Sequence, residues 1–242
     1  MTLMVLTNDD GIGAPGIIAL QQALSDGALL DIENLESVVV APDAPLSGCS
    51  HQMNRGGIIP IDRRGEGEYA IGGTPADCSR VALSHLYPEA DWVLSGINAG
   101  GNMGSDVYLS GTVAAVREAT LLRKRAIALS QYRYRNQPFD WSRASRLTAK
   151  VLSLIMTKPL AQGEFWNVNL PAPPLDTPQN ESADEPDIIF CQSCTQPLPT
   201  DFEIDEAGFR YVGAYEDRLR DPDGDVAVCL SGHISVVKIQ LW

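Results

Sequence analysis

The sequence predicts an α/β fold in which a mostly parallel β-sheet is flanked by helices and followed by a β-rich C-terminal extension. Short apolar runs rich in β-branched residues alternate with helical stretches through the first two thirds of the 242 residues. That alternation is typical of parallel strands joined by covering helices. With 44% hydrophobic residues, the chain is also long enough to bury a sizeable core.

The expected strands and helices follow one another in order along residues 1–171. Pro15 suits the first turn of the first helix, because its missing N–H would have no partner there. The expected elements are a strand at 3–7, a helix near 15–24, a strand at 37–41, a helix at 76–86, a strand at 92–95, a helix at 112–122, a strand at 126–130, a helix at 142–156 and a strand at 166–170. We therefore expect residues 1–171 to form the core domain.

The composition changes after Pro171, where Pro, Asp, Glu and Ser dominate. We expect a linker over 172–187. Residues 188–242 are expected to form the extension, which either packs on the core or serves in oligomerisation. Its strand-like segments are 188–191, 202–211 and 226–239, with a turn at 205–208.

Charge and apolar content limit the possible partners. The chain has 18 Lys and Arg against 31 Asp and Glu, a formal charge of −13, which repels polymeric nucleic acid and anionic membranes. No apolar run approaches the roughly 20 residues of a membrane helix. The start of the chain has no basic region of a signal peptide. Five scattered cysteines favour reduced thiols, so we expect a cytoplasmic protein.

A pair of neighbouring acids, Asp9 and Asp10, follows the first expected strand. In open α/β sheets, ligands bind beyond the carboxyl ends of the strands. Two adjacent carboxylates repel each other there unless a cation neutralises them. Mg²⁺ and Mn²⁺ favour such oxygen ligands, so we expect a metal site. The alternative is that one acid caps the next helix while the other is solvated.

The same segment, Gly11 to Gly16, also matches the dinucleotide-binding pattern GxGxxG between a strand and a helix. An NAD(P)-binding oxidoreductase is therefore an alternative hypothesis. Two carboxylates before the first glycine would face the pyrophosphate, however. Asp43, the acid beyond the second strand, also lies further along than the usual spacing of about 20 residues.

Two further polar loops follow expected strands. In the first, Ser47 could complete the coordination of a hard cation, and His51 could act as a general acid or have no role. The second loop runs over 95–104 and is rich in Gly and Asn. Such a loop is costly to order, which suggests a ligand. The helix start at Thr112, with Ser110 beside it, offers N–H and hydroxyl donors to a phosphate, or Ser110 or Thr112 is only a helix cap.

Taken together, the motifs resemble the SurE family of stationary-phase survival nucleotidases. These motifs are NDDGIGAPG, the segment APD…SG, GGTPADC, SGINAGGNMGSDVYLSGTVAA, NVNLP and GHISVV, in this order along the chain. The resemblance implies a Rossmann-like core and one divalent metal ion per subunit, Mg²⁺ or Mn²⁺. It also implies hydrolysis of nucleoside 5′- and 3′-monophosphates, with short polyphosphate as a further substrate, and a homodimer or homotetramer.

The resemblance also assigns roles to particular residues of this sequence. The implied metal ligands are Asp9, Asp10, Ser47 and Asn98. The implied phosphate-binding residues are Asn102, Ser110, Gly111 and Thr112. Asp9 and Asp10 are the expected catalytic residues, with Asp9 taking a proton from the attacking water. Direct attack by Asp9, which would form an aspartyl phosphate, remains open.

Two other classes of protein are also consistent with parts of the sequence. A phospho-acceptor signalling domain uses paired acids after its first strand, but Lys158 lies at the end of an expected helix and the chain is about twice the size of such a domain. A non-catalytic nucleotide-binding module would bind nucleoside monophosphates and release no phosphate.

Overall fold

The computed structural model describes residues 1–25, 34–173 and 185–242, and it confirms the α/β fold. Its main sheet has nine strands in the order β3-β4-β2-β1-β5-β6-β7-β11-β8. These strands are β1 (Thr2–Thr7), β2 (Leu35–Pro42), β3 (Ile61–Gly65), β4 (Glu68–Ile71), β5 (Trp92–Ala99), β6 (Arg125–Gln131), β7 (Glu164–Leu170), β8 (Ile188–Cys191) and β11 (Ile234–Gln240). Pairing is parallel except between β3 and β4 and between β7 and β11.

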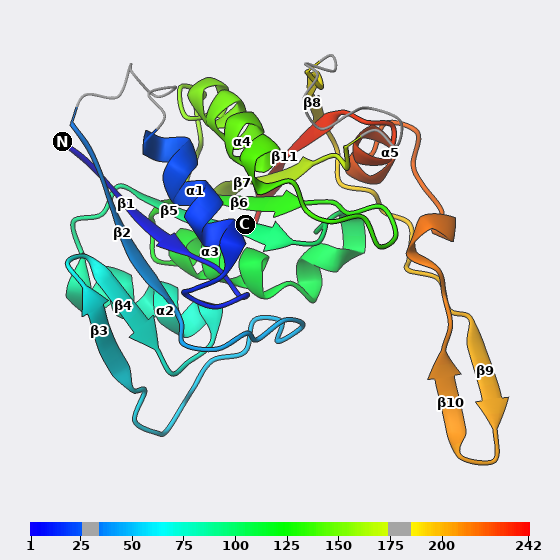
Figure 1. Cartoon of the computed structure of the whole chain (residues 1–242), viewed down its shortest axis with the longest axis horizontal. Helices are drawn as coiled ribbons and strands as arrows, with labels where there is room; N and C mark the ends of the chain where they lie inside the picture. The colour runs from blue at the N-terminus through cyan, green and yellow to red at the C-terminus, as the bar shows by residue number, and fades with distance from the viewer. Residues whose placement is uncertain (26–33, 174–184) are drawn as a thin grey trace.

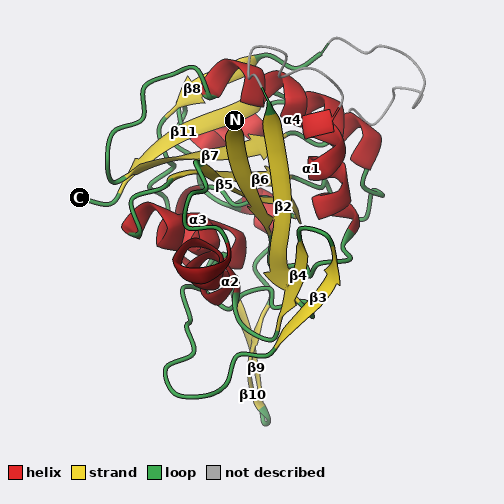
Figure 2. Cartoon of the chain, turned by 90° about the vertical axis from the view of Figure 1, so that its left-hand side faces the viewer, coloured by secondary structure: helices red, strands yellow, loops and turns green. Residues whose placement is uncertain are grey.

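Helices cover both faces of this sheet (Figure 2). They are α1 (Pro15–Ser25), α2 (Pro75–Val81), which continues as a short π-helix (Ala82–Leu86), α3 (Gly111–Leu121), α4 (Trp141–Ile155) and α5 (Asp225–Leu230). Short 3₁₀ turns occupy Gly104–Tyr108 and Tyr215–Asp217. None of the helices in the described part of the chain has the length and apolarity of a bilayer span.

The buried strand β1 shows why the sheet needs helices on both sides. Met4 and Leu6 pack in one core with α1 and α4, whereas Leu3 and Val5 pack in a second core with α2 and α3. Successive side chains of a strand point to opposite faces, so a continuous apolar strand is stable only between two layers. The carboxyl ends of β1, β5, β6 and β7 consequently meet at one edge of the sheet.

Part of the C-terminal prediction is wrong. Residues 226–239 are not one strand-like segment, because α5 occupies Asp225–Leu230 before β11 begins at Ile234. Buried Val226, Val228 and Cys229 belong to this helix. A short apolar run fits a strand and a buried helix equally well. The expected linker at 172–187 falls largely on residues 174–184, which lie outside the described residues.

Residues 188–242 contribute to both the main sheet and a separate hairpin. β11 pairs antiparallel with β7, and β8 pairs parallel with β11. Between them, β9 (Phe202–Asp205) and β10 (Gly208–Tyr211) form a two-stranded sheet that extends away from the body of the molecule (Figure 1). The predicted turn is confirmed, because the Asp205 carboxylate accepts hydrogen bonds from the N–H groups of Ala207 and Gly208.

Candidate active site

Asp9 lies at the end of β1 and against the first turn of α3. The residue is 3% exposed, and the Thr112 hydroxyl donates a hydrogen bond to its Oδ1 atom. A Cβ added to Gly111 would come within 2.8 Å of the Asp9 Cβ, so only glycine allows this approach. Ser110 caps the helix, its hydroxyl accepting a hydrogen bond from the N–H of Val113 at 3.1 Å. The structure therefore brings Asp9 together with three of the expected phosphate-binding residues.

Burial destabilises the ionised form of Asp9. Desolvation raises the pKa of Asp9 from 3.8 to about 6, and the neighbouring charge of Asp10 acts in the same direction. The hydroxyl and backbone of Thr112 oppose this shift by hydrogen bonding. A bound cation would remove the cost of the two adjacent charges.

Asp10 lines an open pocket at the carboxyl end of β1. Its Oδ2 atom accepts a hydrogen bond of 3.0 Å from the N–H of Ala99, the last residue of β5. The pocket, of about 420 Å³, is lined by Asp10, Asp43, Ala99 and Trp141 among others. Asn98 precedes Ala99, and its amide nitrogen donates to the carbonyl of Gly100 at 2.9 Å. The Asn98 Oδ1 atom is therefore the one that a metal ion could use.

The loop that carries Ser47 is attached to Asp9 through its backbone. The N–H of Leu46 donates to the Asp9 carbonyl at 2.8 Å, while the Ser47 side chain is exposed. Further along, the N–H of Ser50 donates to the carbonyl of Leu109 at 3.1 Å. The loop thus packs beside the start of α3 and reaches Asp9 from the side opposite β5.

The His51 side chain pairs with a buried carboxylate, that of Glu118. Its Nε2 atom lies 3.0 Å from Glu118, which is 2% exposed and also pairs with Arg80 at 3.0 Å. The adjacent Cys49 thiol lies near Gly111, because a Cβ there would be 3.1 Å from its Sγ atom. Burial and the charge of Asp9 raise the pKa of Cys49, so this thiol is a poor nucleophile at neutral pH.

Asn102 is fixed by buried polar residues that the motif analysis did not single out as site residues. Its N–H donates to Asn169 Oδ1 at 2.7 Å, and its carbonyl accepts from the amide of Asn167 at 2.8 Å. Its own amide nitrogen donates to the Ser130 hydroxyl at 2.8 Å. The alternation Asn167-Val168-Asn169 places both amides on one face of β7. Two asparagines on one face of an expected buried strand are the sequence signal that could have identified Asn167 and Asn169.

The residues around Asp9 and Asp10 fit a hard divalent cation. Across the described residues, no three His, Cys, Asp or Glu side chains gather into a cluster that could hold a metal ion. Beyond the two carboxylates, the remaining ligands would therefore be neutral oxygens such as those of Ser47 and Asn98. All-oxygen sets of this kind suit Mg²⁺ or Mn²⁺ rather than Zn²⁺.

Gly16, the last glycine of the GxGxxG match, has a packing role. A Cβ there would lie 1.9 Å from the carbonyl oxygen of Ile97, so glycine is required for α1 to pack against β5. The first glycine, Gly11, has φ +98° and its N–H donates to the Asn8 side chain at 3.2 Å. Both glycines are thus explained by the turn and by helix packing, without a dinucleotide.

Comparison with known proteins agrees with this geometry. A family model described as survival protein SurE matches residues 4–193. The chain belongs to the SurE family. Among its SurE relatives, a 5′/3′-nucleotidase SurE from Yersinia pseudotuberculosis is 34% identical, covering 100% of this chain and 91% of the relative. A protein from Nostoc sp. with the provisional name 5′-nucleotidase is 47% identical, covering 98% of this chain and 99% of the relative.

A solved SurE structure shares the fold. The crystal structure of the SurE protein from Aquifex aeolicus matches with a TM-score of 0.80 and 27% identity, over 98% of this chain and 93% of that chain. The match thus extends over residues that follow residue 193, beyond the range of the SurE family model. The prediction of family and fold from the motifs is confirmed.

Proposed function

We propose that this chain hydrolyses nucleoside 5′- and 3′-monophosphates to nucleoside and inorganic phosphate with one divalent metal ion, Mg²⁺ or Mn²⁺, per subunit. The observation that carries the proposal is the buried Asp9 carboxylate beside Asp10 and under the N-terminus of α3. The two carboxylates thus lie beside a helix N-terminus, which is suited to bind a phosphate. The names of the SurE relatives support the substrate class.

The metal ion would be held by Asp9, Asp10, Ser47 and Asn98. When bound, it supplies positive charge that neutralises the two carboxylates and the phosphate oxygens. Ser110, Gly111 and Thr112 at the start of α3 would bind the phosphate oxygens through N–H and hydroxyl groups. Asn102, held by β6 and β7, would offer the second N–H of its amide. These contacts orient the phosphorus for in-line attack by water.

Asp9 is the group best placed to accept the proton of the attacking water. Burial raises the pKa of Asp9 to about 6 in the metal-free protein, which supports this role. Quenching single turnovers with labelled substrate tests the alternative of direct attack. A phosphorylated protein trapped in that experiment would exclude attack by water as the first step.

A phosphate-release assay across a panel of nucleotides, with and without each metal ion, tests the proposed function. Phosphate release from nucleoside monophosphates should require Mg²⁺ or Mn²⁺, and Asp10→Asn should lower kcat at least a hundredfold. Asp43→Asn is the matched control, because it removes an exposed carboxylate from the same pocket. Nucleotide binding without phosphate release would instead identify a non-catalytic binding module.

We also propose that the protein forms a homodimer or homotetramer through residues 188–242. The β9–β10 hairpin exposes Phe202, Ile204, Phe209 and Tyr211, each at least 50% exposed. An isolated two-stranded hairpin with exposed aromatic side chains is marginally stable in water, and such apolar patches mark interaction sites. A second copy of the chain would cover this surface.

The same phosphate site would accept short polyphosphate, whose terminal phosphate presents the same oxygens.

All five cysteines are free, which fits a reducing compartment. We therefore place the enzyme in the cytoplasm.

A further inference from the structure

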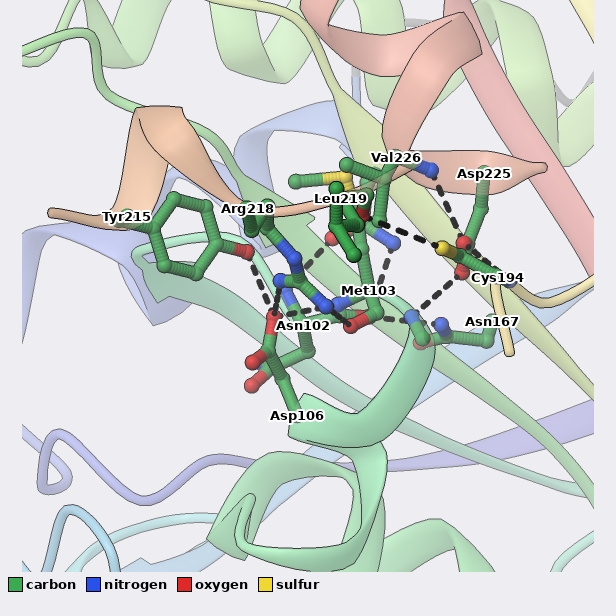
Figure 3. A network of polar contacts seen from close by, with 12 residues as sticks. Asn102, Met103, Asp106, Asn167, Cys194, Tyr215, Arg218, Leu219, Asp225 and Val226 are labelled. Atoms are coloured by element: carbon green, nitrogen blue, oxygen red, sulfur yellow. Dashed lines mark hydrogen bonds and ion pairs between the residues drawn. The ribbon is translucent and has the colours of Figure 1, made fainter. Parts of the chain in front are cut away.

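A buried polar network joins the loop after Asn102 to the C-terminal part of the chain (Figure 3). At its centre is Asp225, which is completely buried. One carboxylate oxygen accepts a hydrogen bond from the N–H of Gly104 at 2.9 Å. The other accepts from the N–H groups of Cys194 at 2.8 Å and Val226 at 2.9 Å. A single side chain thus connects segments that are 121 residues apart.

Arg218 makes a second connection to the same loop. Its Nη1 atom lies 2.9 Å from Asp106 Oδ2, and its Nη2 atom donates to the carbonyl of Met103 at 3.3 Å. The same Asp106 oxygen accepts hydrogen bonds from the Tyr215 hydroxyl and from the N–H of Met103. The Arg218 side chain is completely buried, so the ion pair is shielded from solvent.

Both connections meet at the base of the projecting hairpin. Gln192 pairs with Gly224, and the N–H of Asp225 donates to the Gln192 carbonyl at 2.9 Å. We call residues 192–225 the arm, because the chain leaves the main body at Gln192 and returns at Asp225. Gly104 fits against the arm closely: a Cβ there would lie 2.8 Å from the Cys194 carbonyl oxygen.

The network acts on the residues that immediately follow Asn102. Asn102 is held on one side by Asn167 and Asn169 of β7, and Met103 and Gly104 are held on the other side by the arm. A glycine-rich loop loses much conformational entropy when it is fixed. The buried Asp225 carboxylate and the buried Arg218 guanidinium are themselves costly to desolvate. Their hydrogen bonds, with those of the partly exposed Asp106, order this loop.

We propose that Asp225 and Arg218 are positioning residues that fix the phosphate-binding loop, so that the arm sets the geometry of Asn102 and of the helix start at Ser110. The inference rests on the proposed function, because it assigns the loop a phosphate to bind. Neither residue is among the proposed ligands of the metal ion or the phosphate. Losing either connection should shift the loop relative to Asp9 and lower turnover without removing a catalytic group.

The test compares three variants with two matched controls in the full-length protein. The variants are Arg218→Met, Arg218→Lys and Asp225→Asn. The controls are Arg220→Met and Asp223→Asn, which make the same changes at exposed positions two residues away. For each protein we would measure kcat and KM with a nucleoside monophosphate and Mn²⁺, hydrogen exchange over residues 98–110, and the mass in solution.

Arg218→Met and Asp225→Asn should lower kcat/KM about tenfold to a hundredfold, the effect expected of a misplacement of about 1 Å. Exchange at Met103 and Gly104 should become faster. Arg218→Lys should recover part of the activity, because an ammonium group still pairs with Asp106 but cannot also span to the Met103 carbonyl. Both controls should match the original protein in activity, exchange and mass.

Several results would overturn the proposal. Folded variants with a lower melting temperature but unchanged kcat/KM would show that the network only stabilises the fold. An equal decrease in kcat/KM in the control variants would show a nonspecific effect of charge. If Arg218→Met does not fold, Arg218→Lys and Asp106→Asn decide the question. Should the original protein release no phosphate from any nucleotide, the proposed function fails, and the exchange of residues 98–110 still decides whether the arm holds the loop.

Discussion

At the scale of single residues, Asp9 combines two properties that oppose each other. Its burial against Gly111 and Thr112 makes it a well-ordered group, but the same burial disfavours its charge. The metal-free protein therefore carries a destabilising carboxylate at neutral pH. Function and stability are in conflict at this position until a cation binds.

This conflict makes the stability of the metal-free protein depend on pH. Because the pKa of Asp9 is about 6 when folded and 3.8 in its ordinary state, the folded protein binds more protons between these values. The penalty is absent below about pH 4, grows between pH 4 and 6, and is complete above pH 6. Asp9→Asn should therefore stabilise the metal-free protein by about 3 kcal/mol at pH 8, and this gain should disappear near pH 4.

Urea unfolding in the presence of a chelator, at several pH values from 4 to 8, measures this difference. Asp43→Asn serves as the control for removal of an exposed carboxylate. A free-energy difference between Asp9→Asn and the original protein that stays constant across this range would contradict the assignment of the penalty to Asp9.

Several residues of the candidate site could be singled out from the sequence because each lies directly after a strand or at a helix start. Asp9, Asp10, Ser110 and Thr112 are of this kind. Asp225 and Arg218 were not predictable, because no local pattern links them to a loop more than a hundred residues earlier in the chain. Their role depends on long-range packing, which residue spacing does not encode.

At the scale of secondary structure elements, the buried strands of the core, helices α1 to α4 and the exposed hairpin strands β9 and β10 were predicted, whereas β3 and β4 were not. β3 consists of Ile61–Gly65, four of whose five residues are exposed, so it has no alternation of apolar and polar residues. β4 has only four residues. β4 pairs with β2, and β3 pairs with β4 at the edge of the sheet. The sequence gives little local sign of either pairing.

The hairpin of β9 and β10 is the element whose properties most clearly need a partner. Phe209 is 75% exposed and packs only edge to face on Phe202. Replacing Phe209 and Tyr211 by Ser should disrupt subunit association, because the apolar area buried on association drives most of it. Light scattering should then give the mass of one subunit.

The folded state of the single subunit should survive this change, since both side chains are at least half exposed in the chain. Ile58→Ser is the matched control, because Ile58 is 95% exposed on the loop between β2 and β3. An unchanged mass for the double hairpin variant would show that association does not use the hairpin.

At the scale of the whole molecule, metal binding and folding should be linked. The proposed metal site joins the end of β1 to the end of β5 and, through the Asp9 carbonyl, to the loop after β2. A ligand that binds only the folded state stabilises it by about 2.7 kcal/mol at a hundred times its Kd. Adding Mn²⁺ to the chelator-treated protein should therefore raise its melting temperature.

Asp10→Asn should lose most of this thermal shift, and Asp43→Asn should keep it. Differential scanning fluorimetry over a range of Mn²⁺ concentrations measures both. An equal shift in Asp10→Asn and the original protein would show that the stabilising ion binds somewhere other than the proposed site at Asp9 and Asp10.

The close contact of Gly16 with Ile97 has a consequence for how glycine patterns are interpreted. Dinucleotide-binding proteins also need a glycine at this position to let a helix rest on its neighbouring strand. A steric demand common to both architectures therefore produces the last glycine of the pattern in enzymes that handle quite different cofactors. Gly16→Ala should push α1 away from β5 in this hydrolase, for the same reason that it would in a dehydrogenase. The glycine therefore indicates close packing of a helix on a strand and does not by itself indicate which cofactor binds.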